Sequence, residues 1–292
     1  MKRTEDFIIE YIGDLFSSPF IGDDCAVIDN RIITKDIFIM GTHFPEELPL
    51  YYAGWRSFAG ALSDIAAMGG KPEYFFIGIA GESGEVIKEL VKGVSELARI
   101  YGVELAGGDT VFSMLAVLSF TIVGKAEKPI MRRGARPGDY VYVTGDLGGS
   151  RAGLELFLSG ERATEKFIKP LPRIKEGIEL VEKYNITSMI DISDGLLRDA
   201  ERISRINGVS INLAGEAIPI NQDAMYYCKE RGLHPVVFSV NSGEEYELLF
   251  TSPDDIKEDY VTRIGEVGEG VGINLDNKPV SPEGFEHFRE GK

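Results

Sequence analysis

The chain has 292 residues, and its 31 Lys and Arg are set against 47 Asp and Glu, a formal net charge of −16. A protein that binds nucleic acid needs a basic surface to neutralise backbone phosphates, so this acid excess argues against a nucleic-acid partner. The acid excess does not argue against binding of small phosphate esters, because carboxylates can hold divalent cations that bind phosphates. At 43% hydrophobic residues, the chain is expected to fold around a sizeable core.

The expected compartment is the cytoplasm. No apolar run reaches the roughly 18 residues of a membrane-spanning helix, so no membrane association is expected. Residues 1–10 carry charges where a secretory signal would need an uninterrupted apolar core. The two cysteines, Cys25 and Cys228, lack zinc-binding spacing and are expected to be reduced. The length favours two domains, at roughly 100–200 residues each.

Strands and helices are expected to alternate in the first half of the chain. Segments rich in β-branched and aromatic residues predict strands at 31–40, 74–80 and 115–124. Two amphipathic helices are expected between them, because apolar residues recur with helical spacing over 55–66 and 87–101. Gly69-Gly70 should end the first helix and Gly102 the second.

A domain boundary is expected near Gly134, where a basic run rich in glycine and proline precedes a new strand at 140–144. The boundary divides the chain into residues 1–134 and 135–292. Interspersed strands and helices in both halves predict an α/β (α+β) architecture of two domains. In the second half, strands are expected at 188–192, 209–213, 236–240, 246–251 and 271–275, and helices at about 150–159, 174–184 and 196–206.

Aspartates stand beside small residues in five segments that we expect to form turns. An Asp with such neighbours at the end of an apolar strand would lie at the rim of a sheet, with little bulk to block a ligand. Ordinary interpretations exist for each: Asp23, Asp24 or Asp109 could be turn residues, and Ser193 or Asp194 could cap a helix. The five segments are 22–26, 34–36, 62–64, 107–110 and 191–195.

Two aspartates have settings that favour a ligand. Asp64 lies opposite the apolar stripe of its helix, on a face with Ser57, Gly60 and Ala61, where a solvated helix would carry long charged residues. This bare face indicates close approach by another backbone or a ligand. Asp191 interrupts an apolar strand, and a buried charge there needs a cation or hydrogen-bond donors to compensate it.

Convergence of these carboxylates would require bound cations. Two like charges about 4 Å apart repel by about 4 kcal/mol even at an effective dielectric constant of about 20. Several Mg²⁺ ions would remove this repulsion, because Mg²⁺ prefers oxygen ligands and is often shared between carboxylates and substrate phosphates. The chain lacks the P-loop motif, the protein-kinase motifs and a dinucleotide-binding glycine motif in a strand-turn-helix setting.

A series of short motifs covers nearly the whole chain, and its order is more specific than any single member. They are Gly-Asp-Asp-Cys-Ala-Val at 22–27, Gly-Thr-His-Phe at 41–44, Ala-Leu-Ser-Asp-Ile-Ala-Ala-Met-Gly at 61–69, Gly-Gly-Asp-Thr at 107–110, Arg-Arg-Gly-Ala-Arg-Pro-Gly-Asp at 132–139, Tyr-Val-Thr-Gly at 142–145, Ile-Asp-Ile-Ser-Asp-Gly-Leu at 190–196, Gly-Glu-Glu-Tyr-Glu-Leu-Leu-Phe at 243–250 and Gly-Phe-Glu-His-Phe at 284–288. Together they resemble the thiamine-monophosphate kinases, relatives of aminoimidazole ribonucleotide synthetases, selenophosphate synthetases and hydrogenase maturation proteins.

The resemblance implies an amino-terminal domain that dimerises through its sheet, a carboxy-terminal α/β domain, and ATP bound with several Mg²⁺ ions near the dimer interface. It also implies a role for particular residues by motif position. The implied metal ligands are Asp24, Thr34, Asp36, Asp64, Asp109, Asp191 and Asp194. The implied ATP contacts are Gly108, Asp109, Arg132 and Ser193, and His43, Glu244 and Phe285 are implied near thiamine phosphate.

Lys35 departs from the family pattern. The family usually reads Ser-Thr-Asp where this chain has Thr34-Lys35-Asp36, so an ammonium replaces a hydroxyl that could assist a metal. Either the backbone carbonyl of Lys35 suffices, or one metal site is weakened and Lys35 contacts a phosphate directly. Glu245, where the family commonly has Asp, is a milder change.

The implied reaction transfers a phosphoryl group from ATP to thiamine phosphate, giving thiamine diphosphate. A phosphate monoester has a second pKa near 6, so the acceptor is already largely anionic and needs no general base. Bridging metal ions and Arg132 would lower the repulsion between the two anions and align an in-line transfer. His43 could instead be a turn residue, and Phe285, expected to stack on a substrate ring, could instead pack in the core.

Three other hypotheses remain open. A sister enzyme of the same superfamily would use ATP to activate a different small acceptor. A nonenzymatic protein could bind Mg²⁺ and nucleotide with the same fold, as Lys35 allows. Finally, the acids could merely solubilise an ordinary domain.

Overall fold

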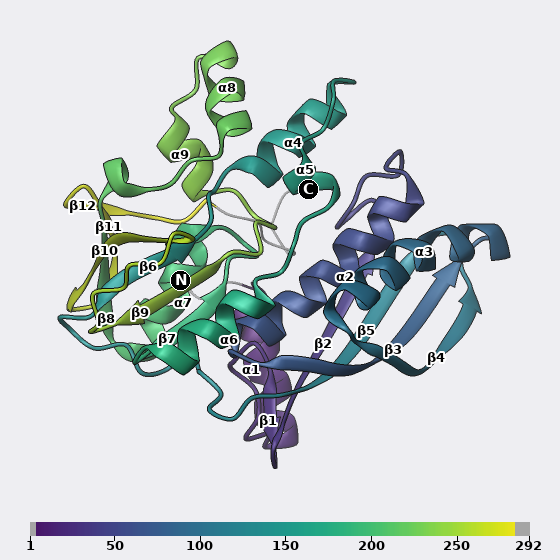
Figure 1. The fold of residues 1–292 in the computed structure, drawn as a ribbon, viewed down its shortest axis with the longest axis horizontal. Coiled ribbons are helices and arrows are strands. Elements are labelled where there is room, and N and C mark those ends of the chain that lie inside the picture. The colour runs from purple at the N-terminus through teal and green to yellow at the C-terminus, as the bar shows by residue number, and fades with distance from the viewer. Residues whose placement is uncertain (1–3, 284–292) are drawn as a thin grey trace.

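The computed structural model describes residues 4–283. Two β-sheets lie side by side, with helix α2 between them (Figure 1). All strands of the first sheet come from residues 26–125, and all strands of the second from residues 140–280. The expected mixed α/β (α+β) class is therefore confirmed.

The first sheet has five strands in the order β1-β2-β5-β3-β4. Strands β3 and β4 are parallel, whereas the other neighbours are antiparallel. Along β5, Leu118, Phe120 and Ile122 are buried beneath the helices, and their neighbours face the open side of the sheet. The strands are β1 (Ala26–Ile28), β2 (Arg31–Ile39), β3 (Lys71–Gly81), β4 (Glu104–Phe112) and β5 (Val117–Lys125).

Two long helices, α2 (Leu50–Ala67) and α3 (Gly84–Tyr101), cover one face of this sheet (Figure 1). They cross closely, because a Cβ on Gly54 would lie 1.9 Å from the Leu90 carbonyl oxygen. Helix α3 begins where the Ser83 side chain accepts a hydrogen bond from the Val86 N–H. It ends at Gly102, as expected, with a φ of 66° in the left-handed region.

The second sheet has seven strands in the order β12-β11-β8-β10-β6-β9-β7, and helix α7 packs on one of its faces. Its strands are β6 (Tyr140–Thr144), β7 (Ser188–Asp191), β8 (Val209–Leu213), β9 (Leu248–Ser252), β10 (Val261–Glu269), β11 (Gly272–Leu275) and β12 (Lys278–Val280). The accompanying helices are α4 (Gly149–Leu158), α5 (Glu165–Ile168), α6 (Ile174–Lys183), α7 (Leu196–Asn207), η1 (Gly215–Ala217), α8 (Gln222–Arg231) and α9 (Pro235–Val240).

Helix α2 joins the two halves of the molecule. It contacts α6 and β7 of the second half as well as the first sheet. A Cβ on Gly177, in α6, would lie 2.5 Å from the Ala66 carbonyl oxygen of α2, so these helices touch through their backbones. The largest apolar cluster accordingly contains residues of both halves, such as Phe58 and Phe250. Any ligand beside the carboxyl end of α2 is thus surrounded by both halves.

One predicted strand is wrong: residues 236–240 form helix α9. A short apolar run does not by itself separate a strand from a buried helix. Pro235 occupies the first turn, where its missing N–H costs nothing, and Phe238 packs on Tyr227 of α8. Strand β9 also begins at Leu248, later than expected, because Tyr246 has a φ of 54°.

Three expected turns are instead regular structure. Residues 34–36 lie inside β2, residues 62–64 inside α2, and residues 107–110 inside β4. In β4 the glycines permit close strand pairing, because a Cβ on Gly108 would lie 2.0 Å from the Ile77 carbonyl oxygen.

Several elements were not expected from the sequence. They include α1 (Thr4–Phe16), β1, α5, α8, β10 and β12. Within residues 4–283, the helices fall short of the length and apolar character needed to cross a bilayer. Cys25 and Cys228 are both free and buried.

Candidate active site

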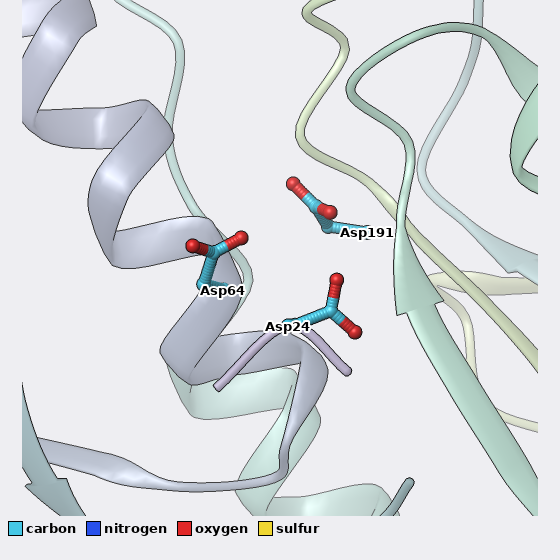
Figure 2. A group of neighbouring side chains, drawn as sticks. All are labelled: Asp24, Asp64 and Asp191. Carbon is cyan, nitrogen blue, oxygen red and sulfur yellow. The ribbon is translucent and has the colours of Figure 1, made fainter. Parts of the chain in front are cut away.

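Three aspartates from distant parts of the chain converge where the two halves meet. Asp24 precedes β1, Asp64 lies near the end of α2, and Asp191 ends β7. One carboxylate oxygen from each lies within 4.8 Å of the others. Figure 2 shows the three side chains turned towards a common space. The sequence left open whether the aspartates converge, and the structure brings these three together.

The setting of each acid follows from its element. Strand β7 is buried throughout, so its last residue, Asp191, is only 2% exposed. Asp64 occupies the small-residue face of α2, where a Cβ on Gly60 would lie 2.8 Å from Phe38 and 2.9 Å from the Tyr246 hydroxyl. The sequence indicated close approach by another backbone or a ligand, but in the structure two side chains approach this face.

Burial and mutual repulsion raise the pKa values of Asp64 and Asp191. Burial is the largest cause for both Asp64 and Asp191, whose pKa values lie well above the usual range, and neighbouring aspartates raise them further. Burial also raises the pKa of Asp36 to about 6, although Lys35 opposes the shift. Buried carboxylates this close together are stabilised either by protonation or by bound cations.

Strand β2 brings Thr34 and Asp36 to the same side. Thr34 Oγ1 donates a hydrogen bond to Asp64 Oδ2, and Asp36 lines the adjacent cavity. Because side chains alternate along a strand, Lys35 lies on the opposite, open face of the sheet. There its Nζ donates to Ser119 Oγ, so the ammonium group points away from the aspartates.

Arg132 holds Asp24 through two hydrogen bonds. Nη2 lies 2.5 Å from Oδ1, and Nε lies 3.2 Å from Oδ2. The Arg132 backbone N–H also donates to Asp23 Oδ1 at 2.5 Å. Burial alone would lower the pKa of Arg132, but the Asp24 carboxylate raises it above its usual value. Residues 22–25 form a bend, as a turn interpretation allows, but the side chains of Asp23 and Asp24 make long-range contacts with Arg132.

The loop after β7 carries Ser193 and Asp194 to the wall of the cavity. Neither caps α7, whose N-cap is Gly195 and has no side-chain cap. Asp194 instead pairs with Arg202, which also lies 2.5 Å from Asp199 Oδ1. The sequence reasoning missed Asp199, because a charged residue inside a helix gives no sign that it will be buried.

A cavity of about 1160 Å³ adjoins the three aspartates. His43 and Glu244, both expected near the acceptor, line it. The His43 Nδ1 atom accepts the Ile39 N–H at 3.0 Å, which assigns the proton of the neutral ring to Nε2. Other lining residues are Asp36, Asp64, Ser150, Arg151, Phe167, Asp191, Ser193, Asp194 and Tyr246.

Two other expected contacts lie elsewhere. Gly108 and Asp109 are on β4, three strands from β2 in the same sheet, which is roughly 14 Å at the usual strand spacing. Asp109 is exposed, and its Oδ1 accepts the Thr110 N–H at 2.8 Å. Within one chain, these residues are therefore apart from the aspartate cluster. Phe285 lies outside the described residues.

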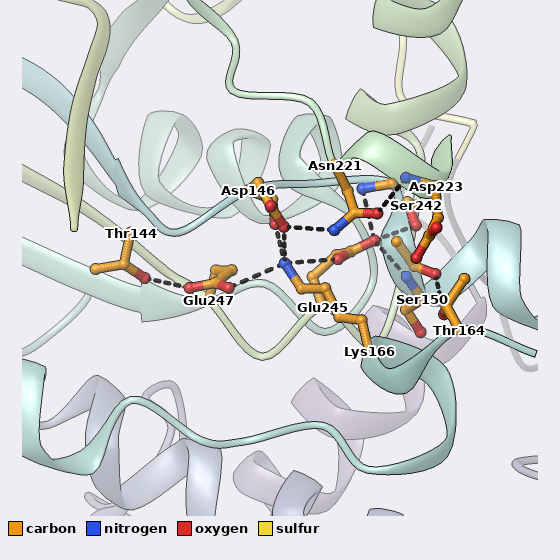
Figure 3. A network of polar contacts seen from close by, with 12 residues as sticks. Thr144, Asp146, Ser150, Thr164, Lys166, Asn221, Asp223, Ser242, Glu245 and Glu247 are labelled. Atoms are coloured by element: carbon orange, nitrogen blue, oxygen red, sulfur yellow. Dashed lines mark hydrogen bonds and ion pairs between the residues drawn. The ribbon is translucent and has the colours of Figure 1, made fainter. Parts of the chain in front are cut away.

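A buried ionic network lies behind the cavity wall and was missed by the sequence reasoning (Figure 3). Lys166 Nζ lies 2.8 Å from Asp146 Oδ1, 3.0 Å from Glu247 Oε1 and 3.3 Å from Glu245 Oε2. Arg173 adds a hydrogen bond of 2.6 Å from Nε to Glu247. These charges come from three separate segments, so no local pattern indicated their pairing.

The aspartate cluster suits a hard divalent cation. Mg²⁺ binds oxygen at about 2.1 Å, so two ligands on one ion are at most about 4.2 Å apart. The oxygens of Asp24, Asp64 and Asp191 lie within 4.8 Å of one another, so side-chain shifts of less than about 1 Å would bring them into range. The set of carboxylate oxygens, and the raised pKa values of Asp64 and Asp191, fit such an ion.

Comparisons with known proteins agree with the sequence motifs. Residues 22–126 match the family described as "AIR synthase related protein, N-terminal domain". The chain is 37% identical over 264 residues to a thiamine-monophosphate kinase from Methanopyrus kandleri, covering 88% of this chain and 85% of that one. It is 35% identical over 306 residues to the thiamine-monophosphate kinase from Aquifex aeolicus, covering 99% of both chains.

A solved structure shows the same fold over the full length. The structure described as "AaThiL complexed with AMPPCP and TMP" superposes with a TM-score of 0.92 at 31% identity, covering 99% of both chains. With this fold, this cluster of acids and relatives of this similarity, the chain belongs to the thiamine-monophosphate kinase family.

Proposed function

We propose that this protein transfers the terminal phosphoryl group of ATP to thiamine phosphate, giving thiamine diphosphate and ADP. The observation that carries the proposal is the convergence of Asp24, Asp64 and Asp191 beside a cavity of about 1160 Å³. A related structure was solved with an ATP analogue and TMP. The cavity has room for a phosphate ester and its attached rings.

The three converging aspartates would hold Mg²⁺, with Thr34 and Asp36 on β2 and Asp194 at the cavity wall as further ligands. Bound Mg²⁺ would supply charge neutralisation for the reacting phosphates. Arg132 would turn from Asp24 towards a phosphate, since its guanidinium is already beside the cluster. Ser193 would contact the nucleotide from the loop after β7.

No side chain is assigned as a catalytic base. The acceptor oxygen of a phosphate monoester is already anionic near neutral pH, so the residues need only bind and align the two phosphates. His43 is suited to contact with the acceptor, because its Nδ1 is occupied by the Ile39 N–H and its Nε2–H can donate. Glu244 and Phe285 are proposed as contacts for the organic part of the acceptor.

We also propose that the protein is a homodimer formed through the open face of the first sheet. Ile37, Phe76 and Val111 on this face are each at least 45% exposed, which is unusual for large apolar side chains in a group. A second copy on this face would cover them. It would also bring Gly108 and Asp109 close to the nucleotide bound by the partner. Size-exclusion chromatography with light scattering tests the stoichiometry.

The division into domains at residues 1–134 and 135–292 is proposed on topology, because the boundary falls between the two sheets. A cytoplasmic location is proposed on the composition and the two reduced cysteines. Separate expression of residues 135–292 would test the boundary, since a folded fragment should unfold cooperatively.

Purified protein should form thiamine diphosphate from thiamine phosphate and ATP only when Mg²⁺ is present. Asp64→Asn should lose this turnover while keeping the fold, whereas the exposed control Asp259→Asn should keep both. A panel of other small acceptors, assayed alongside, separates this reaction from that of a sister enzyme. Absence of product from the wild type across a range of Mg²⁺ concentrations would refute the kinase proposal.

A further inference from the structure

A buried arginine lies directly behind the cavity. Arg56, on α2, is only 2% exposed. Its Nη1 donates to the Phe167 carbonyl oxygen and its Nη2 to Glu244 Oε2, while its Cζ lies 4.2 Å from the centroid of the Phe167 ring. Phe167 and Glu244 both line the cavity. Burying a guanidinium is costly unless it is paired, and here each polar contact goes to a cavity-lining residue.

The backbone of Glu244 is held as tightly as its side chain. Glu244 has a φ of 55°, in the left-handed region that few residues other than glycine adopt. Its N–H donates to the Ser193 carbonyl oxygen at 2.7 Å, which ties it to the loop of the metal cluster. Strained conformations of this kind persist where surrounding contacts fix them, often at binding sites.

One oxygen of the Glu244 carboxylate is left for a ligand. Within residues 4–283, the side-chain partner of Glu244 is Arg56, and it uses Oε2. The carboxylate is 30% exposed towards the cavity, so Oε1 can contact a bound molecule. A carboxylate fixed by a buried guanidinium loses less conformational entropy when it binds a ligand than a free one.

Helix α2 also sets the position of this carboxylate relative to the metal cluster. Arg56 and Asp64 are eight residues apart on the same buried helix, about 12 Å along its axis. The helix is therefore a rigid spacer with the phosphate-binding acids near one end and the Arg56–Glu244 pair near the middle. An acceptor that carries a phosphate at one end and a cationic ring at the other fits this arrangement of charges.

We propose that Arg56 is a positioning residue for the acceptor: it orients the Glu244 carboxylate towards the cationic ring and so sets acceptor affinity. The inference rests on the proposed function, in which the acceptor is thiamine phosphate with its thiazolium cation. In this proposal Arg56 acts through Glu244, and not on the nucleotide or the transferred phosphate. Its effect should therefore be confined to the acceptor.

Steady-state kinetics of a double-mutant cycle test the inference. Arg56→Met and Glu244→Gln are each expected to raise the KM for thiamine phosphate by about 10- to 100-fold, with the KM for ATP changed less than twofold. The KM of the double variant for thiamine phosphate should not exceed that of the more impaired single variant, because the two substitutions remove the same interaction. Arg56→Lys, which can reach only one of the two acceptor atoms, should give an intermediate KM.

The matched control is another arginine with the same kind of contacts. Arg231 Nη2 lies 2.8 Å from Glu161, and its Cζ lies 4.6 Å from the centroid of the Tyr227 ring, on the exposed side of α8. Arg231→Met should leave both KM values unchanged. If Arg56→Met does not fold, the cycle is run with Arg56→Lys, and the same non-additivity is required.

Each remaining outcome has a defined meaning. Equal increases in the KM for ATP and for thiamine phosphate, or additive effects of Arg56 and Glu244 variants, would overturn the positioning role while leaving the proposed reaction intact. Calorimetry that detects no thiamine phosphate binding to the wild type would overturn both.

Discussion

Arg132 and Asp24 form a buried bidentate pair at the edge of the aspartate cluster, with Nη2 2.5 Å from Oδ1 and Nε 3.2 Å from Oδ2. The same carboxylate lies within 4.8 Å of those of Asp64 and Asp191. Arg132 is thus the cation that compensates Asp24 when no metal is bound. A metal ion that uses Asp24 must share it with the guanidinium or displace it.

Replacing Arg132 should therefore lower the stability of the metal-free protein and increase the stabilisation that Mg²⁺ gives. In EDTA, Arg132→Met should lower the free energy of unfolding by about 3–5 kcal/mol, because Asp24 loses its buried partner. Mg²⁺ should then raise the melting temperature of the variant more than that of the wild type, since Asp24 is already available. Thermal unfolding with and without Mg²⁺ measures both. Substitution of the exposed neighbour, Arg133→Met, is the control. If Mg²⁺ stabilises Arg132→Met no more than it stabilises the wild type, the metal ion does not compete with Arg132 for Asp24.

Removal of one acid from the cluster should stabilise the metal-free protein. The charge of Asp64 is opposed by burial and by Asp36, Asp191 and Asp24. Asparagine keeps an acceptor for Thr34 but removes this repulsion, so Asp64→Asn should gain about 1–2 kcal/mol in EDTA at pH 8. Denaturant unfolding should show the gain together with loss of the stabilisation by Mg²⁺. A variant less stable than the wild type in EDTA would argue against a cluster built for a cation.

Asp199 should make the stability of the metal-free protein depend on pH. Burial raises its pKa from 3.8 to about 7, although Arg202 opposes the shift. Between these values the folded state binds more protons than the unfolded state, so stability is present at low pH and is lost as pH rises through 7. The loss should be about 2–4 kcal/mol, at about 1.36 kcal/mol for each pH unit.

Denaturant unfolding in EDTA at pH 4.5, 6 and 8 measures this dependence. The raised pKa values of Asp36, Asp64 and Asp191 act in the same direction, so the wild type should lose stability at each step. The free energy of unfolding of Asp199→Asn should fall less between pH 4.5 and pH 8 than that of the wild type. That of Asp259→Asn should fall as much as in the wild type. A wild type that gains stability between pH 6 and pH 8 would show that these carboxyls do not control the titration.

Local sequence patterns predicted the buried strands of the second sheet that are rich in β-branched and aromatic residues. Residues 140–144 and 209–213 form β6 and β8 with the expected bounds, because their β-branched and aromatic residues are buried between neighbouring strands. Strand β4 was not predicted, since an exposed edge strand with two glycines has the composition of a turn. Helix α9 was not predicted because six residues contain too little periodicity to separate helix from strand.

The aspartate cluster could be anticipated because its members stand among small or apolar neighbours, where a solvated charge would be unusual. Arg56 could not, since it is a single charged residue in a helix and its partner Glu244 is 188 positions away. Asp109, implied as a metal ligand by motif position, lies on β4 at the far edge of the first sheet, and no local pattern indicated that distance. Contacts between distant segments depend on the fold, and no local signal contains them.

The network around Lys166 gives the last prediction. Lys166 is 16% exposed and pairs with Glu245 and Glu247, whose side chains are at most 2% exposed. Lys166→Met should cost about 3–5 kcal/mol of unfolding free energy, because it leaves buried Glu245 without its cation and Glu247 with Arg173 alone. Lys183→Met, which breaks pairs of a lysine that is 49% exposed, should cost less than about 1 kcal/mol.

Adding Glu245→Gln to Lys166→Met should recover part of the loss, because it removes the uncompensated charge of Glu245 while the amide oxygen still accepts the Gly148 N–H. Chemical denaturation of the two single variants and the double variant measures the coupling. Glu245 and Glu247 flank Tyr246, whose side chain lines the cavity, so the network anchors this wall from behind. A Lys166→Met protein as stable as Lys183→Met would show that water, and not the lysine, compensates these carboxylates.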